Sequence, residues 1–336
     1  MFQVTSVLLM KNKKLFLFSS LLIFLLIVFF VISIIAGSEN IFLMEKNSAR
    51  FILLNLRLPR SILVMLSGSL LAASGALFQG FFRNSLADSG IIGVSSAATL
   101  GAVIAEFLPL FLKNFIGKIV TPSVIGAFVF SLFCALIISS FSRLNRGDKT
   151  VSILLGGTAL GAFFSALTSI IILMHDREMH KIYIWNLGSF SGKGWSELYF
   201  ILLPSLVSFI LLSFCSRRLD LIFAGELAAQ AMGLNVKSFQ NLVLASGCLC
   251  ASCAVCSGGT ISFIGLISPH IIRKCTGPQS KTLFPLSCLS GSILLLLSDL
   301  ICRTAARPAE IPIGIITALI GSPFFLWILF SNRGTD

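Results

Sequence analysis

Apolar runs of about twenty residues recur along almost the whole chain, and they constrain its fold more than any other feature. A helix of about 20 apolar residues spans the roughly 30 Å hydrocarbon core of a bilayer. Ten runs can be assigned, at residues 15–36, 61–82, 90–112, 120–141, 150–174, 198–215, 239–257, 261–274, 282–302 and 311–330. Because lipid offers the backbone no hydrogen-bond partners, each run is predicted to be helical.

The composition excludes a soluble protein. Of the 336 residues, 56% are hydrophobic and 11% are charged, and such a surface could not be kept in water. The formal net charge of +12 comes without a nucleic-acid-binding motif, so no nucleic-acid partner is expected. The sequence therefore predicts an all-α, polytopic membrane protein with about ten transmembrane helices, in which residues 1–336 form a single domain.

Basic residues before the first run predict how the chain is oriented. Lys11, Lys13 and Lys14 precede a run that is too long for a cleaved signal peptide and is followed by no A-x-A-like site. The run is read as a retained anchor that starts in the cytoplasm. Ten spans then place both termini on the cytoplasmic side of the cell (inner) membrane.

The eighth run is short and contains Pro269, so we expect it to be broken or tilted.

A polar island at residues 217–237 separates two long apolar runs. Its inner part, from Glu226 to Met232, consists of helix formers, with Gly225 before it and Gly233 after it. This pattern predicts a short capped helix in a cytoplasmic loop, accessible to a partner outside the bilayer. The rival interpretation is an amphipathic helix that lies in the membrane interface.

Two motifs suggest chemistry that the residues do not support. The segment Gly188–Gly194 reads GSFSGKG, one residue short of a Walker A loop, and Gly194 replaces the Ser or Thr that would bind magnesium. No nucleotide site is expected here, so any ATP hydrolysis would need a separate subunit.

Four cysteines, at 248, 250, 253 and 256, lie among Gly, Ala and Ser without His or carboxylate neighbours, which favours tight packing over a metal site. We predict no enzymatic activity, metal or cofactor.

Ionisable residues within the apolar runs are few: Glu106, His270 and Asp299. Asp299 precedes Arg303 by four residues, so an intrahelical ion pair is sufficient to explain it. A proton-coupled carrier normally has carboxylates near the membrane midplane, and their scarcity argues against one. An ion-coupled secondary transporter or channel nevertheless remains the alternative function.

Three clusters rich in Gly and Pro occur in a fixed order. They begin at Arg57-Leu58-Pro59-Arg60 and Arg83-Asn84-Ser85-Leu86-Ala87-Asp88-Ser89-Gly90, continue at Gly259–Arg273, and end at Asp299–Phe325 with Glu310-Ile-Pro312-Ile-Gly314. Together with the polar island they resemble the FecCD-type permeases of bacterial ABC importers for iron chelates, haem and cobalamin. The chain departs from the family pattern at Ser85 and Ser89, where the family has prolines, which predicts a looser loop.

The resemblance implies a type II ABC importer permease in the lipid bilayer, built from two copies of this chain or from a copy and a paralogue. Its partners would be cytoplasmic ABC ATPase subunits and an extracytoplasmic substrate-binding protein. Arg57, Arg60 and Arg303 match the arginines that dock the binding protein, although interfacial snorkelling is an alternative. Residues at the coupling helix would contact the ATPase: Gly225, Glu226, Ala229 and Gly233. The cargo would be an iron chelate (ferric siderophore or haem) or cobalamin.

Overall fold

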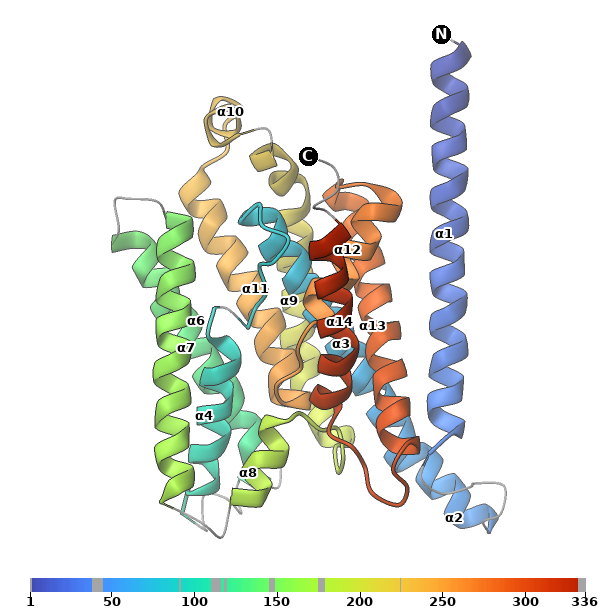
Figure 1. Ribbon diagram of the computed structural model, residues 1–336, viewed down its shortest axis with the longest axis vertical. Helices are drawn as coiled ribbons and strands as arrows, with labels where there is room; N and C mark the ends of the chain where they lie inside the picture. The colour runs from blue at the N-terminus through green and yellow to red at the C-terminus, as the bar shows by residue number, and fades with distance from the viewer. Residues whose placement is uncertain are drawn as a thin grey trace.

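The computed structural model describes residues 2–37, 45–90, 92–109, 116–117, 120–144, 149–174, 179–223 and 225–331. Within these ranges the fold is a bundle of helices without strands (Figure 1). The helices are α1 (Phe2–Ile35), α2 (Lys46–Phe51), η2 (Ile52–Arg57), α3 (Leu58–Phe81), α4 (Val94–Glu106), α6 (Pro122–Leu144), α7 (Lys149–Leu173), α8 (Met179–Asn186), α9 (Trp195–Phe223), α10 (Glu226–Ala231), α11 (Val236–Gly258), α12 (Ile264–Thr276), α13 (Ser280–Thr304) and α14 (Ile313–Ser331).

Each of the ten predicted runs overlaps one of these helices, and the all-α prediction is confirmed. Among the described residues, seven helices are long and apolar enough to cross a membrane, while α4 and α14 are shorter apolar helices. The eighth run forms the 13-residue helix α12, which has Pro269 inside it. Helices α2, η2 and α3 follow one another without a break, and α9 continues to Phe223. These two spans therefore extend well beyond the predicted runs 61–82 and 198–215.

The extension of α9 shortens the polar connection. Residues 217–223 belong to the helix, so the segment between α9 and α11 comprises residues 224–235, with α10 inside it. The helix continues past its apolar part because a polar side chain is bound by a neighbour. Asp220 Oδ1 accepts hydrogen bonds from the backbone N and the Oγ of Ser280, at 3.0 and 2.6 Å, in the first turn of α13.

Two helices form the centre of the bundle. In both α3 and α11, 78% of the most apolar 18-residue stretch is buried inside the protein. Helix α3 packs against α13, α11, α12 and α9, and α11 also packs against α6. At the opposite extreme, only 6% of the corresponding stretch of α1 is buried. Helix α1 packs mainly on α13, through a separate hydrophobic cluster around Leu22, Leu286 and Ile293.

Glycines allow the central helices to cross at close range. A Cβ added to Gly68 of α3 would lie 2.4 Å from the carbonyl oxygen of Gly291 in α13. One added to Gly75 would lie 2.0 Å from the carbonyl oxygen of Gly265 in α12. No side chain fits at such distances, so these pairs bring backbones together, as small residues do between membrane helices.

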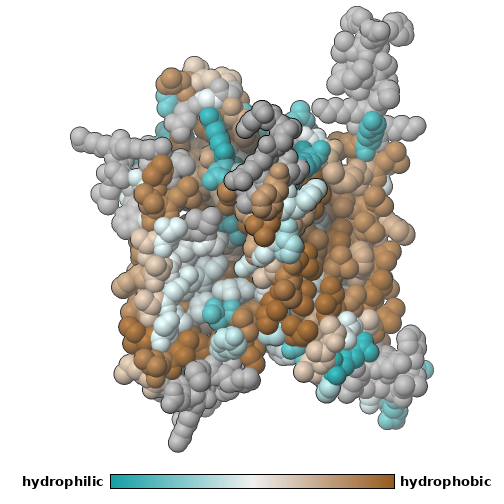
Figure 2. Space-filling model, viewed as in Figure 1, coloured by the Kyte–Doolittle hydropathy of each residue, from teal (hydrophilic) through white to brown (hydrophobic). Residues whose placement is uncertain are grey.

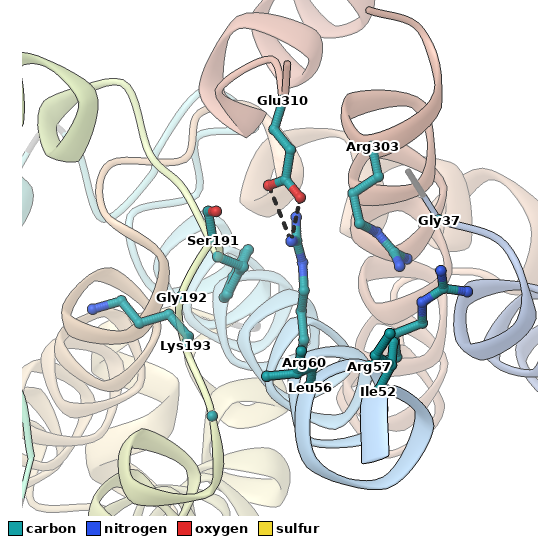
Figure 3. Close-up of a pocket in the computed structure, with 12 residues that line it drawn as sticks. Gly37, Ile52, Leu56, Arg57, Arg60, Ser191, Gly192, Lys193, Arg303 and Glu310 are labelled. Atoms are coloured by element: carbon teal, nitrogen blue, oxygen red, sulfur yellow. Dashed lines mark hydrogen bonds and ion pairs between the residues drawn. The ribbon is translucent and has the colours of Figure 1, made fainter. Parts of the chain in front are cut away.

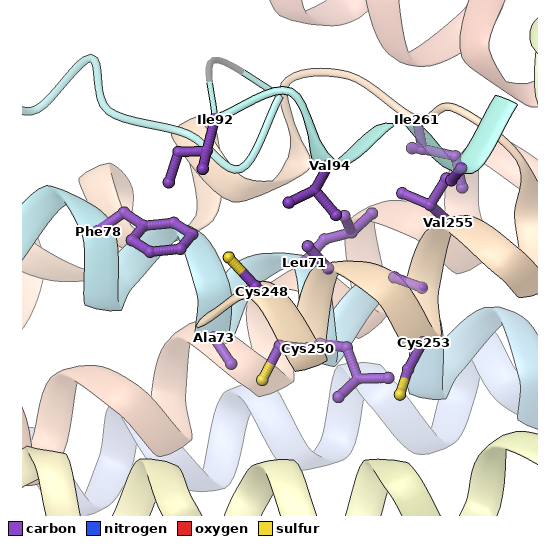
Figure 4. Packing of buried hydrophobic residues seen from close by; sticks show 14 of the residues in the cluster. Leu71, Ala73, Phe78, Ile92, Val94, Cys248, Cys250, Cys253, Val255 and Ile261 are labelled. Carbon is purple, nitrogen blue, oxygen red and sulfur yellow. The ribbon is translucent and has the colours of Figure 1, made fainter. Parts of the chain in front are cut away.

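The cysteines of α11 lie inside this packed centre. Cys248, Cys250 and Cys253 are buried, Cys248 on the side of α11 that faces Phe78 and Val94 and the other two on the opposite side (Figure 4). Burial of these small thiols between α11 and its neighbouring helices accounts for them as packing residues. Within the described part of the chain, no group of three or more His, Cys, Asp or Glu side chains is placed to hold a metal ion.

The two ends of the bundle differ in character. Helix α10, the start of α1 and the end of α14 lie at one end (Figure 1). Helices α2 and α8 and the connection from α13 to α14 lie at the other (Figure 1). The two groups of residues predicted to bind partners are thus about one bundle length apart.

Candidate functional site

A pocket of about 450 Å³ opens at the end opposite α10. Its walls come from η2 and the start of α3, from the α8–α9 connection, and from the end of α13 with the segment that follows it. The lining residues are Gly37, Ile52, Leu56, Arg57, Arg60, Phe190, Ser191, Gly192, Lys193, Gly194, Arg303 and Glu310 (Figure 3). All three arginines predicted from the sequence to dock a binding protein line this one pocket.

Arg60 is held by two carboxylates. Its Nη1 donates to both oxygens of Glu310, at 2.9 and 3.0 Å (Figure 3). Its Nη2 and Nε donate to Asp299 Oδ1, at 2.8 and 3.2 Å. The planar guanidinium therefore uses both of its edges, the geometry for which arginine is suited.

Arg303 is paired with Asp299, as the i,i+4 spacing predicted. Its Nε lies 2.9 Å from Asp299 Oδ2, in an ion pair whose angle is poor for a hydrogen bond. Its Nη1 donates to the carbonyl oxygens of Ser33 and Ala36, at 3.0 and 3.1 Å, and Nη2 donates to Ser33 Oγ at 2.8 Å. Only 3% of Arg303 is exposed, so its guanidinium ties α13 to the end of α1.

Arg57 also points toward the end of α1. Its Nη1 donates to the carbonyl oxygens of Ile34 and Ile35. Gly37 leaves room for the guanidinium, since a Cβ there would lie 2.5 Å from Arg57 Nη2. The predicted arginines are thus brought together, but in this conformation their side chains are held largely inside the protein. Their docking role stays a prediction.

The sequence reasoning assigned no role to Glu310 or Ser33, although both bind predicted site residues. Glu310 is 27% exposed and is the carboxylate at the mouth of the pocket that contacts Arg60. A lone acidic residue between two apolar runs, just before Pro312, is a signal that could have identified it. Ser33 gave no such signal, because a serine inside an apolar run is common.

Lys193 contributes backbone rather than charge to the pocket. Its side chain points away from Arg60 (Figure 3). Burial lowers the pKa of the Lys193 ammonium, and the charge of Glu197 acts in the opposite direction. The surrounding Gly188–Gly194 segment joins two helices, α8 and α9, rather than a strand and a helix, which is not the setting of a phosphate-binding loop.

The second candidate site is the connection that contains α10. The helix runs from Glu226 to Ala231, one residue shorter than predicted, and projects from the bundle (Figure 1). Gly225 before it and Gly233 after it have φ of +118° and +86°, which favour glycine. Ala229 is fully buried, whereas 83% of Leu227 is exposed. The side chain of Glu226 lies outside the described part of the structure.

The base of α10 is anchored to the bundle on both sides. Arg83 donates a hydrogen bond to the carbonyl oxygen of Ile222 at the end of α9. Asn235 Oδ1 accepts from the backbone N of Ser238 at 3.0 Å and caps α11. The α10 connection is thus continuous with α9 and α11, and Arg83 links the end of α9 to the segment that follows α3.

Helix α7 exposes small and weakly polar residues beside large apolar ones such as Leu155, Phe163 and Ile170. Its exposed residues include Thr158, Ala162, Ser165, Ala166 and Ser169. Ser165 Oγ lies 3.2 Å from Ser96 Oγ of α4. On the face seen in Figure 2, pale and weakly polar surface lies in the middle of the molecule between brown hydrophobic regions.

In the described residues, an all-helical apolar bundle with a projecting short helix at one end and an arginine pocket at the other is the architecture of a polytopic membrane protein. The chain belongs to the FecCD transport family, whose model matches residues 15–331. It is 40% identical over 285 residues to an uncharacterized ABC transporter permease, YvrB, of Bacillus subtilis (strain 168), covering 84% of this chain and 80% of YvrB.

Relatives of known cargo are nearly as similar. The cobalamin import permease BtuC of Halobacterium salinarum is 38% identical, over 84% of this chain and 74% of BtuC. The hemin transport permease HmuU of Yersinia pestis is 35% identical, over 83% of each chain. Among solved structures, an inward-facing putative metal-chelate type ABC transporter matches with a TM-score of 0.82 and 31% identity, covering 95% of this chain and 99% of that one.

The family defines the general activity. This chain is a membrane permease of a metal-chelate or cobalamin ABC importer, in which a separate subunit hydrolyses ATP and a binding protein delivers the substrate. It is a multi-pass protein of the inner membrane.

Proposed function

We propose that two copies of this chain form the path for an iron chelate, with both termini and α10 on the cytoplasmic side. The observation that carries this proposal is the separation of the two candidate sites, with α10 at one end and the arginine pocket at the other. An importer needs a contact for its ATPase inside and a contact for its binding protein outside. The bundle has a surface suited to each.

The pocket with Arg57, Arg60 and Arg303 would receive carboxylates of the binding protein. Arg60 already binds Glu310, so a carboxylate of the partner would share or displace that contact. Arg60→Glu would set three carboxylates side by side and unfold the site. Arg60→Lys is the sharper test, because it keeps the charge but loses the two-edged geometry.

We expect Arg60→Lys to weaken binding-protein affinity about tenfold, the loss of roughly one charge-assisted hydrogen bond. Arg50→Lys, on the exposed surface of α2, is the matched control and should leave affinity unchanged. Affinity would be measured on the permease in nanodiscs. Equal affinities for wild type and Arg60→Lys would remove the docking role.

Helix α10 would fit against the ATPase and pass its closure to the bundle. Gly233→Ala tests this, because an alanine at φ +86° is strained although no atom would clash with its Cβ. ATP hydrolysis stimulated by binding protein should fall, while the permease stays folded. Gly117→Ala, with equally open space, no positive φ and a position outside both candidate sites, should preserve stimulation. Unchanged coupling in Gly233→Ala would favour an interfacial role for α10.

The weakly polar face of α7 would line the path between the two copies. Small residues such as Ala162 and Ser165 offer a bulky chelate little that could hold it. Cross-linking of Ser165→Cys to its counterpart in a second copy would support this arrangement. A permease that stays monomeric in the liposomes in which it transports would contradict it.

Uptake into liposomes decides the function and the cargo. The permease, its ATPase and its binding protein would be supplied with a ferric siderophore, haem or cobalamin. We expect ATP-dependent uptake of a ferric siderophore that is lost when the binding protein is omitted. Uptake driven by an ion gradient without the ATPase would instead establish an ion-coupled carrier.

A further inference from the structure

A second cavity, of about 350 Å³, lies between α9 and α13 at the end of the bundle that carries α10. Its lining residues on α9 are Phe209, Leu212, Ser213, Ser216 and Arg217, and those on α13 are Lys281, Phe284, Pro285 and Cys288. Each set repeats at the three- and four-residue spacing of one helix face. The cavity is therefore a groove between two facing helix surfaces.

The groove has a charged end and an apolar floor. Arg217 and Lys281 are both exposed and lie at the end of the bundle, where α9 finishes and α13 begins. From Arg217 to Phe209 the helix descends eight residues, about 12 Å at 1.5 Å per residue. This length is most of one leaflet of the hydrocarbon core, which is about 15 Å deep.

Asp220, the acidic residue near the charged end of the groove, is already engaged in hydrogen bonds. Asp220, one turn beyond Arg217, accepts both hydrogen bonds from Ser280 and does not line the groove. Its negative charge is thereby engaged at the start of α13.

The rest of the surface around the groove is suited to lipid. On α9, large hydrophobic side chains remain exposed, among them Leu203, Leu206, Ile210 and Phe214. Residues of this kind at membrane depth face acyl chains rather than water. The groove is thus continuous with a lipid-facing surface, and its lining cations, Arg217 and Lys281, lie only at the end near α10.

We propose that this groove binds one anionic phospholipid, with the phosphate between Arg217 and Lys281 and an acyl chain along Phe209 and Phe284. The amphipathic order of the groove matches that of a phospholipid, and basic residues at the cytoplasmic ends of spans attract anionic headgroups. A zwitterionic phospholipid also carries a phosphate, but its ammonium group would lie close to the two cations and cancel the attraction in part. The proposal does not depend on the identity of the transported cargo.

The test uses the full-length permease in detergent, titrated with phosphatidylglycerol or phosphatidylcholine of identical acyl chains. Ligand binding to the folded state raises the unfolding temperature. We expect phosphatidylglycerol to bind more tightly. The double variant Arg217→Gln, Lys281→Gln should lose about thirtyfold in affinity for it, since each basic residue contributes about a factor of five.

Arg218→Gln is the matched control, because Arg218 is the exposed neighbour of Arg217 but does not line the groove. It should keep the preference for phosphatidylglycerol. Ser213→Trp, which fills the groove but keeps both cations, should abolish that preference.

Three results would overturn the proposal. They are equal binding of the two lipids, an unchanged preference in the double variant, and equal stabilisation by inorganic phosphate alone. The last would mark a site for free anions rather than for a lipid.

Discussion

Asp299 is the residue on which the arginine pocket depends. It is 1% exposed, it accepts from Arg60, and it pairs with Arg303, so a single buried carboxylate balances two guanidiniums. Glu310 contacts Arg60 from the partly exposed side. The two carboxylates therefore differ in how much they are screened by solvent.

We expect Asp299→Asn to lower the free energy of unfolding by about 3–5 kcal/mol, because it leaves a buried cation uncompensated. Glu310→Gln should cost about 1 kcal/mol or less, as partly exposed pairs do. Unfolding of both variants in mixed micelles would measure the difference. Equal losses would show that burial does not distinguish the two carboxylates.

Asp88 provides a pH-dependent contribution to stability. It lies in the α3–α4 connection beside Gly265, and burial raises the pKa of its carboxyl, although hydrogen bonds from Ser89 and Gly90 lower it in part. A carboxyl with a higher pKa in the folded state stabilises the fold fully below the unfolded-state pKa, about 3.9. That stabilisation is lost as pH rises through the folded-state pKa.

Asp88→Asn should therefore gain stability relative to the wild type as pH rises from about 4 toward neutral. The comparison is the difference in free energy of unfolding between the two proteins at each pH. A difference that stays constant across this range would contradict the raised pKa.

At the scale of the elements, glycine crossings determine how closely helices approach. The contact of Gly75 with Gly265 joins α3 to α12, the helix interrupted by Pro269. Gln79, one turn later, donates to the carbonyl oxygen of Gly265 at 3.1 Å and accepts from Arg273 at 3.1 Å. Close packing and this polar contact hold the same pair of helices together.

Gly75→Ala should destabilise the permease by about 1–3 kcal/mol or more, because its Cβ would overlap a backbone oxygen. Gly161→Ala in α7 is the matched control, since its nearest contact would be an ordinary 3.4 Å. It should be neutral or stabilising, as alanine favours helix more than glycine. Thermal unfolding separates the two, and similar midpoints would count against the close crossing.

At the scale of the whole molecule, one natural probe reports the orientation in the membrane. Cys275, at the end of α12, is the exposed one of the nine cysteines, and the others are buried or partly buried. Helix α12 ends at the same end of the bundle as α10 (Figure 1). If that end is cytoplasmic, Cys275 faces the cytoplasm.

A membrane-impermeant maleimide should then label the protein in inverted membrane vesicles and not in intact cells. Cys275→Ser should remove the labelling. Labelling from outside intact cells would reverse the proposed orientation, and with it the assignment of α10 to the ATPase.

Local patterns in the chain were enough to predict the helices. Hydropathy located a helix in each of the ten predicted runs, seven of which are long enough to cross a membrane in the described residues, and glycines at 225 and 233 delimited α10 to within one residue. These features depend on residues close in sequence, through the need to satisfy each backbone group in lipid. The length of α9 was missed because Asp220 is bound by Ser280, sixty positions away.

The sequence by itself thus determined the fold class, the spans and, through its motifs, the family. Only the tertiary structure decided how the arginine pocket is assembled. Arg60 meets Asp299 and Glu310 across 239 and 250 positions, and Arg303 meets Ser33 across 270. Hydropathy and helical periodicity carry no information on such partners, because the contacts exist only once α1, α3 and α13 have packed side by side.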